Sequence, residues 1–310
     1  MKKLRFVVSL VTADNDYQIE QASAAEEAAR RLGVDVQIIY ADNDSITQSQ
    51  QLLKIIQSRD AHPDGIIFEP VGGTALPQVA RAAVAAGIGW GVLNRDVEYI
   101  SELRRSHRVP IFAVTSDHEE IGRIQGNQFN ALLPNGGSVL YIQGPSESIA
   151  TKHRTTGMYE TKGDIQVKLV KANWTESSAY KAISSWLRLS TSRQSHMDVI
   201  CAQNDAMAIG ARKAFQELPE NAGRDRWLSL PYLGVDGVSK TGLAWIKRGL
   251  LSGTVVVPPN TGKALEMLAQ ACQGGFIPPE RTTTVPVAFP PLDMLAVANS
   301  GKTKTFAAGI

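Results

Sequence analysis

Short apolar runs alternate with helical patterns along most of the chain, and this alternation is the feature that most limits the possible folds. A strand followed by a crossover helix returns the chain to the same edge of a sheet, so repeated units of this kind require a parallel sheet. The expected strands are 6–11, 34–40, 65–68, 88–93, 111–115, 138–142, 166–171, 199–202, 229–235, 253–257 and 283–287. The sequence therefore predicts an α/β protein.

The alternation is interrupted at residues 101–108, which have no clear period. This segment carries Arg104, Arg105, His107 and Arg108, and we interpret it as a solvated connection instead of a functional basic patch. A chain of 310 residues exceeds the size at which one hydrophobic core keeps growing. The two sets of units therefore predict two doubly wound parallel-sheet lobes, with late segments returning to the first lobe.

Charge and hydropathy exclude some function classes. The chain has 32 Lys+Arg against 30 Asp+Glu, a net charge of +2, and no dense basic block, so we expect no nucleic-acid partner. No apolar run is long enough to span a bilayer. Cys201 lies in an expected core strand and Cys272 on a late helix, and two buried free thiols are favoured over a disulfide.

Polar side chains follow several of the expected strands. Glu69 follows one strand, the pair Asn94 and Arg95 another, Asn204 and Asp205 a third, and Asp236 a fourth. Ligands of open α/β sheets bind at the carboxyl ends of the strands, where loops and helix N-termini leave polar groups available. Each residue alone is as easily a helix cap or turn, but together they predict one shared polar cleft.

Catalytic and cofactor motifs are missing from the sequence. Residues 234–241 come nearest to a P-loop, but Ser239 stands where that loop requires its second glycine. The histidines are scattered without metal-ligand spacing, and no nucleophile elbow occurs. Carboxylates such as Glu69 and Asp236 could form the acid and base of a glycoside hydrolase, but binding uses the same residue types. We expect no enzyme activity, no catalytic residue, no metal and no cofactor.

Four segments carry a resemblance to a known family. They are the run Ala202–Gly210, the pair Asn94 and Arg95, the run Thr115–Asp117, and the run Gly234–Gly237. In their order and spacing the chain resembles the ribose and galactose type of periplasmic sugar-binding protein, whose core is shared with the lactose-repressor family. The resemblance covers essentially the whole length. It implies a type I periplasmic binding fold with lobes 1–115 plus 258–286 and 116–257 plus 287–310, joined by a multi-strand hinge.

The resemblance also implies a ligand site. Carried over by position, the ligand contacts are Asn15, Tyr17, Glu69, Asn94, Arg95, Arg154, Trp174, Asn204 and Asp236. Amide, carboxylate and guanidinium groups can pair with sugar hydroxyls, and aromatic rings can cover the apolar faces of a sugar. Core packing for Trp174, solvation for Arg154, and surface pairing of Arg95 with Asp96 or Glu98 are the alternatives.

Some positions depart from the ribose binders. Glu69 stands where they carry an amide, Asn94 where they carry an acid, Gln18 where a second aromatic is common, and Val257 where they place a hinge glutamine. A different monosaccharide, a polyol or a sugar derivative therefore stands beside ribose as the expected ligand.

The function implied by the resemblance is that of a solute-binding protein. It would close its two lobes over a monosaccharide or polyol and deliver it to the membrane permease of an ABC transporter. The alternative is an extracytoplasmic sugar-sensing domain of a signalling receptor. The resemblance further implies a monomer and a periplasmic or extracytoplasmic location, with the signal peptide expected to be absent from this sequence.

Overall fold

The computed structural model describes residues 3–58, 62–72, 75–95, 97–189, 192, 195–274 and 276–296. The chain divides into an N-terminal unit, Met1–Ser116 with Pro258–Val285, and a C-terminal unit, Asp117–Val257 with Pro286–Ile310. The chain passes from one unit to the other after Ser116, Val257 and Val285. The first passage was expected after residue 115 and the third after residue 286, so each of these two limits differs by one residue.

The N-terminal unit is built around a parallel sheet whose strand order is β11-β5-β4-β3-β1-β2. Every neighbouring pair in it is parallel. The elements in chain order are β1 (Arg5–Leu10), α1 (Asp16–Leu32), β2 (Asp35–Tyr40), α2 (Ser45–Gln57), β3 (Gly65–Phe68), α3 (Pro77–Ala85), β4 (Gly89–Leu93), α4 (Tyr99–Ser106), β5 (Ile111–Ser116), α12 (Asn260–Gln273) and β11 (Arg281–Thr284).

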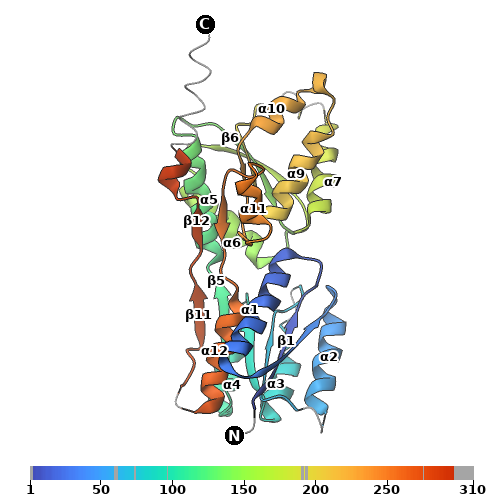
Figure 1. Cartoon of the computed structure of the whole chain (residues 1–310), viewed down its shortest axis with the longest axis vertical. Coiled ribbons are helices and arrows are strands. Elements are labelled where there is room, and N and C mark those ends of the chain that lie inside the picture. The colour runs from blue at the N-terminus through green and yellow to red at the C-terminus, as the bar shows by residue number, and fades with distance from the viewer. Residues whose placement is uncertain are drawn as a thin grey trace. The chain divides into compact units, whose positions relative to one another are not determined.

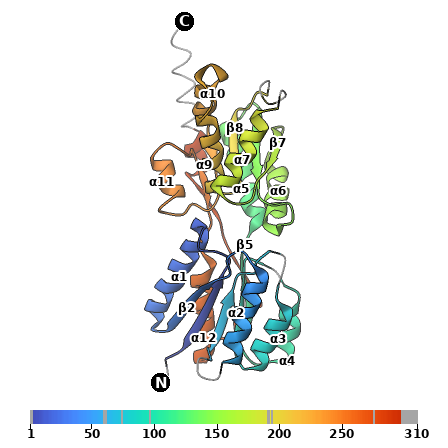
Figure 2. The same ribbon diagram turned by 90° about the vertical axis from the view of Figure 1, so that its right-hand side faces the viewer.

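Helices cover both faces of this sheet. α2, α3 and α4 bury their apolar side chains against one face, and α1 and α12 against the other, as Figures 1 and 2 show. The approach of α12 depends on small residues in the strands. A Cβ atom on Gly89 would lie 2.7 Å from Leu268 of α12, so this glycine serves packing.

The C-terminal unit repeats the pattern with a parallel sheet of order β7-β6-β8-β9 and an antiparallel pair, β10 and β12. α7 and α9 pack on one face of the sheet, and α5 and α6 on the other. The elements are α5 (His118–Leu132), β6 (Ser138–Gln143), α6 (Ile149–Thr161), β7 (Gln166–Lys171), α7 (Glu176–Leu187), β8 (Val199–Ala202), α9 (Asp205–Gln216), η1 (Glu220–Ala222), α10 (Arg224–Ser229), β9 (Tyr232–Leu233), α11 (Gly242–Lys247), β10 (Thr254–Val256) and β12 (Val287–Phe289).

This architecture confirms the predicted fold class of two doubly wound parallel sheets. The prediction of a solvated connection at 101–108 was wrong. Residues 101–106 of that segment belong to α4, which buries Tyr99, Ile100 and Leu103. Arg104 is half-buried and donates to the carbonyl of Ile111 at 2.6 Å.

Two predicted strands also differ from the structure. The strand expected at 229–235 is reduced to β9, because α10 occupies the residues up to Ser229. The strand expected at 283–287 spans the end of β11 and the start of β12. It is interrupted at Pro286, which has no N–H group for a sheet ladder.

The cysteines are free, as expected. Cys201 is buried in β8, whereas Cys272 is half-buried on α12.

Candidate functional site

In the N-terminal unit, the predicted residues gather at the carboxyl edge of the sheet, where the parallel strands β1, β3 and β4 end. The sheet has its topological switch point between β1 and β3, because the chain leaves β1 for β2 on one side and returns to β3 on the other. Ligands of open α/β sheets bind at such points. The residues concerned are Asn15, Tyr17, Glu69, Asn94 and Arg95.

Asn15 fixes the loop that follows β1. Its Oδ1 accepts hydrogen bonds from the backbone N–H groups of Tyr17 at 3.0 Å and Gln18 at 3.2 Å, so it caps α1. Capping by asparagine satisfies N–H groups that have no partner within the helix. The cap holds the half-buried Tyr17 in the first turn of α1, at the same edge as Glu69.

Glu69 is the acceptor at the centre of this edge. Gln18 bridges the switch point: its Oε1 accepts from the backbone N–H of Val11 at 2.9 Å, and its Nε2 donates to Glu69 Oε2 at 2.9 Å. Burial raises the pKa of the half-buried Glu69 above its ordinary value, while hydrogen bonds from Gln18 and Asn94 and the charge of Arg95 act in the opposite direction. The site thus presents a carboxylate supported by amide donors.

Arg95 lies beside this carboxylate without a close ion pair. Its Nη2 donates to the carbonyl of Gly72 at 2.5 Å. Burial lowers its pKa, an effect that the charge of Glu69 opposes. Among the described residues, no carboxylate oxygen lies within 4.0 Å of a guanidinium nitrogen of Arg95, the distance that defines an ion pair. Glu98 is therefore not its partner, and Asp96 lies outside the described residues.

In the C-terminal unit, the predicted residues again follow the ends of parallel strands, and Arg154 and Trp174 form a stacked pair. Arg154 on α6 is only 6% exposed. Its guanidinium carbon lies 5.5 Å from the centre of the Trp174 ring, and its Nη1 donates to the carbonyl of Gln203. A guanidinium over an indole face is held by cation–π attraction. Arg154 is therefore not a solvated surface residue.

Trp174 follows β7 and packs partly on the core of this unit. A Cβ atom on Gly144 would lie 2.4 Å from its ring, so the ring rests on a residue that must be glycine. Asn204, buried at the start of α9, holds Trp174 from the other side: its Nδ2 donates to the Trp174 carbonyl at 2.9 Å. Asn204 Oδ1 also accepts from the backbone N–H of Met207 and caps α9.

Asp236 follows β9, the neighbour of β8, and is half-buried. Its backbone is paired with the segment around β10 through Val255 at 2.9 Å and Val257 at 3.0 Å. The nearby Asp205 is instead a structural group. It is 3% exposed and accepts from the backbone N–H of Gly237 and the hydroxyl of Thr254.

Three of the predicted residues have positive φ angles that side chains rarely adopt. These angles are 54° at Asn94, 60° at Trp174 and 107° at Asp236. A bulky residue in this region costs on the order of 1 to 3 kcal/mol, and such residues concentrate at functional sites. Asparagine and aspartate tolerate this region better than bulky residues do, and Asp42, Asn43 and Leu76 also have positive φ angles. The strain therefore supports a functional role chiefly for Trp174.

Sequence reasoning missed three residues at these edges. Gln18 supports Glu69, and Gln203 is its counterpart at the switch point between β6 and β8, where its Oε1 accepts from the backbone N–H of Gly144 at 2.9 Å. His118 opens α5 next to Arg154. Burial and the charge of Arg154 lower its pKa well below the ordinary value, and its buried Nδ1 has no hydrogen-bond partner among the described residues. In the sequence, only the position of His118 shortly after the end of an expected strand could have indicated this residue.

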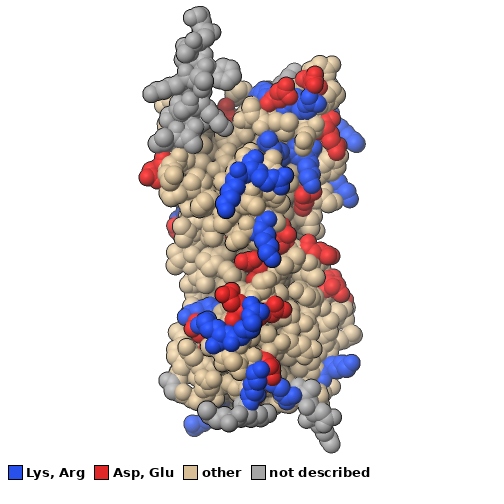
Figure 3. All heavy atoms as spheres, in the orientation of Figure 1, with Lys and Arg blue, Asp and Glu red and all other residues tan. Residues whose placement is uncertain are grey.

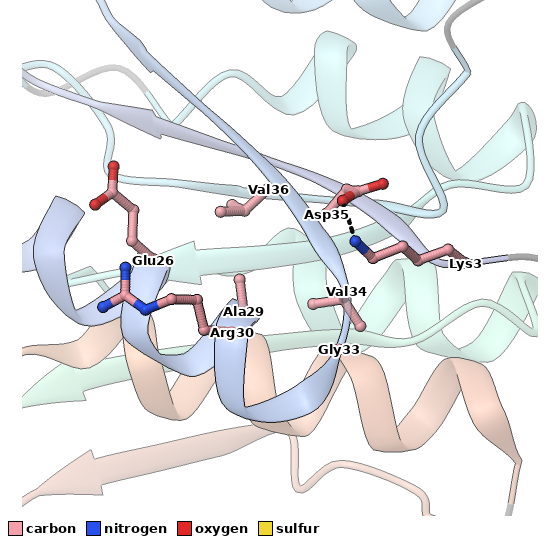
Figure 4. Close-up of a pocket in the computed structure, with 8 residues that line it drawn as sticks. All are labelled: Lys3, Glu26, Ala29, Arg30, Gly33, Val34, Asp35 and Val36. Carbon is pink, nitrogen blue, oxygen red and sulfur yellow. Dashed lines mark ion pairs between the residues drawn. The ribbon is translucent and has the colours of Figure 1, made fainter.

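A surface hollow of about 350 Å³ lies at the other end of the first sheet (Figure 4). An ion pair of 2.6 Å joins Lys3 and Asp35 at its rim. Both side chains are 56% exposed, so the hollow is open to solvent and separate from the carboxyl edge. Its lining residues are Lys3, Glu26, Ala29, Arg30, Gly33, Val34, Asp35 and Val36.

Among the described residues, no group of three or more His, Cys, Asp or Glu side chains is arranged to hold a metal ion. No helix in the described part of the chain is both long and apolar enough to cross a membrane.

Comparison with known proteins gives a consistent result. The sequence profile of a family described as "Periplasmic binding protein domain" matches residues 6–275. The ribose import binding protein of Bacillus subtilis is 26% identical over 261 residues, covering 84% of this chain and 78% of that protein. The D-allose-binding periplasmic protein of Escherichia coli is 26% identical over 283 residues, covering 88% and 86%. An ABC transporter periplasmic solute binding protein from Actinobacillus succinogenes with bound D-allose has a TM-score of 0.79 at 21% identity, covering 96% of this chain and 100% of that chain.

Proposed function

The chain belongs to the family of periplasmic binding proteins, and from this premise we propose that it binds a monosaccharide or related polyol and delivers it to an ABC-type permease. The family match confirms the resemblance found in the sequence. The relatives named above bind ribose or allose. Because those relatives are binding proteins, we extend the proposal to a chain that catalyses no reaction and needs no cofactor.

The observation that carries the proposal is the chemistry of the two carboxyl edges. One edge offers the Glu69 carboxylate with its amide donors. The other offers the Arg154 guanidinium and the Trp174 ring. A polyhydroxy ligand donates to a carboxylate, accepts from a guanidinium and stacks its C–H face on an aromatic ring. These are the groups that a sugar or polyol requires.

We propose all nine predicted residues as ligand contacts. They differ in how many hydrogen-bond donors and acceptors they have left for a ligand. Asn15 and Asn204 already use their Oδ1 atoms as helix caps, so they would contact ligand through other atoms. Glu69 and Asp236 would accept from hydroxyl groups, and Arg95 and Arg154 would donate. Contacts drawn from both units would favour a closed state, since a ligand shifts a conformational equilibrium by its differential affinity for the two states.

Partners and location follow from the family in the same way. We propose a monomer in the periplasm or another extracytoplasmic space, with a membrane permease as its protein partner. On the face shown in Figure 3, acidic and basic side chains lie next to each other. Among the described residues, ion pairs such as that of Arg31 with Glu266 also bring opposite charges together. Mixed charge of this kind supports a small neutral ligand over a nucleic acid.

A thermal-shift screen against monosaccharides and polyols, including D-ribose and D-allose, tests the binding function. A ligand that binds only the folded state stabilises it by about 2.7 kcal/mol at a hundredfold excess over Kd. The same titration with a chelator present is expected to give the same affinity. If no sugar or polyol raises the melting temperature, or if the bound sugar is chemically converted, the proposed function is wrong.

The transport role needs a separate experiment. Uptake of the identified ligand by cells that carry the chain and its permease is expected to stop when the chain is deleted. Normal uptake together with loss of a ligand-dependent kinase or chemoreceptor response would instead support the sensing alternative.

A further inference from the structure

Asn260 is a buried residue whose side-chain amide contacts a candidate ligand residue, Asn94, from a distant part of the sequence. It is the first residue of α12 and is 0% exposed. Its Oδ1 accepts from the hydroxyl of Thr284 at 2.7 Å. Its Nδ2 donates to Ser116 Oγ at 3.1 Å and to Asn94 Oδ1. Both N–H groups and the carbonyl of this amide are therefore engaged.

These bonds run in one direction, toward Glu69. The Glu69 carboxylate can only accept, so the nitrogen of Asn94 faces it and the oxygen of Asn94 accepts from the nitrogen of Asn260. The Thr284 hydroxyl, which can donate or accept, supplies a proton to the oxygen of Asn260 that remains. The oxygen of Asn94 is then occupied, and its nitrogen is the atom that can donate to the Glu69 carboxylate. The hydrogen bond from Asn94 opposes the rise that burial causes in the pKa of Glu69. An asparagine amide reversed at this point would present its oxygen to a carboxylate and be repelled.

The backbone of Asn94 does not by itself fix this orientation. Asn94 has a φ of 54°, and its side-chain amide is nearly symmetrical in shape, so the two orientations differ mainly in their hydrogen bonds. The Glu69 carboxylate, which only accepts, and the Asn260 nitrogen, which only donates, fix it together from the two ends of the amide. The bond from Asn260 reaches Asn94 from a residue 166 positions away in the sequence.

We propose that Asn260 is a positioning residue for the ligand site, which fixes the amide of Asn94 as a donor to Glu69. This inference rests on the proposed function for its meaning, but its geometry lies wholly within the N-terminal unit. The alternative is a purely structural role. Ser116 is the last residue before the first passage between units, and Thr284 lies one residue before Val285, where the third passage begins, so Asn260 also ties these segments together.

Two substitutions and one control separate these roles. Asn260→Ala removes the donor to Asn94, and Thr284→Val removes the hydroxyl that pairs with Asn260 Oδ1 while keeping the shape of the Thr284 side chain. Thr261→Val is the matched control. Thr261 is the next residue, is also 0% exposed, and bonds through Oγ1 to Gln21 Oε1 at 3.0 Å instead of to the site. Thr261→Val therefore removes a buried hydrogen bond from the same helical turn without touching the site.

The first readout needs no ligand. Carboxyl-carbon NMR of Glu69 is expected to show a higher pKa in Asn260→Ala and in Thr284→Val than in the parent, because the carboxylate loses a fixed donor. The pKa in Thr261→Val is expected to equal that of the parent. The same pKa in all four proteins would overturn the inference whether or not a ligand has been found. The milder Thr284→Val keeps this test decisive if Asn260→Ala does not fold.

The second readout is the affinity for the sugar or polyol identified in the screen. We expect about 10-fold weaker binding for Asn260→Ala and about threefold for Thr284→Val, in line with the loss of one oriented hydrogen bond. Thr261→Val is expected to stay within about twofold. In an Asn94→Ala background, Asn260→Ala is expected to change affinity less than about twofold, because its effect passes through Asn94. Fully additive losses would overturn the proposal in favour of the structural role.

Discussion

The carboxyl edges of the two sheets share one feature, but its hydrogen-bond partners differ. Each has a glutamine at its topological switch point, Gln18 in the N-terminal unit and Gln203 in the C-terminal unit. Gln18 directs its amide N–H at the side chain of Glu69. Gln203 directs its side chain at Tyr141, Thr155 and the backbone of Gly144 and Thr151.

Ligand affinity and stability should therefore depend on different contacts in the two units. In the N-terminal unit, side chains support another side chain that faces the proposed ligand, so substitutions there should change affinity more than stability. In the C-terminal unit, Arg154 and Asn204 bond to backbone carbonyls that shape their own loops. Substitutions there should therefore change both affinity and stability.

The largest expected effect is that of Arg154→Ala. The variant loses a charge-assisted hydrogen bond to a buried carbonyl and the stacking on Trp174, and we expect destabilisation of about 2 kcal/mol. Ligand affinity should fall at least about 100-fold, because a guanidinium donor to the ligand is lost too. Arg154→Lys should recover only part of the affinity, since an ammonium cannot reproduce a planar fork. Titration calorimetry measures the ligand affinity, and urea unfolding measures the free energy of unfolding. An unchanged unfolding curve would contradict the comparison.

Glu69→Gln should have a smaller effect, on affinity alone. The variant keeps the shape of the side chain but loses the charged acceptor, so we expect binding weaker by about 10-fold, or ~1.4 kcal/mol. Burial raises the pKa of Glu69, which means that the folded state disfavours its ionised form relative to the unfolded chain. Stability at pH 7 should therefore be equal to or higher than that of the parent. A marked loss of stability would show that Glu69 is a structural group.

The pH dependence of binding should show the smallest effect. Because the folded-state pKa of Glu69 is raised above its ordinary value of 4.5, the carboxylate that accepts ligand hydroxyls is lost as the pH falls through that raised value. The affinity of the parent should therefore begin to fall at a pH above 4.5, by a few-fold. The stability contribution of Glu69 has the opposite sign, being largest below its unfolded pKa and lost as the pH rises through the folded one. Glu69→Gln, measured over the same pH range, should lack this component of the affinity profile.

The ends of the strands were predictable because they are local features. An apolar run of four residues followed by Glu69, or one followed by Asn204, is visible in a short window, and β3 and β8 have the predicted limits. α4 was missed because the segment was assessed from residue 101 onward, which separated Leu103 from Tyr99 and Ile100 on the same buried face.

The supporting contacts were not predictable for a different reason. Gln18 meets Glu69 across 51 residues, and Asn260 meets Asn94 across 166. Such pairs depend on strand order and on the return of α12 to the first sheet, which no local pattern encodes. The direction of an amide also has no signal in the sequence, since it is set by the donors that surround it.

A crystal structure with the tightest-binding sugar or polyol is the decisive test of the proposed site. We expect ligand oxygens within about 3.2 Å of both the Glu69 carboxylate and the Arg154 guanidinium, with the ring or carbon chain of the ligand against Trp174. A ligand that touches only one of the two carboxyl edges, or that occupies the hollow beside Lys3 and Asp35, would contradict this expectation.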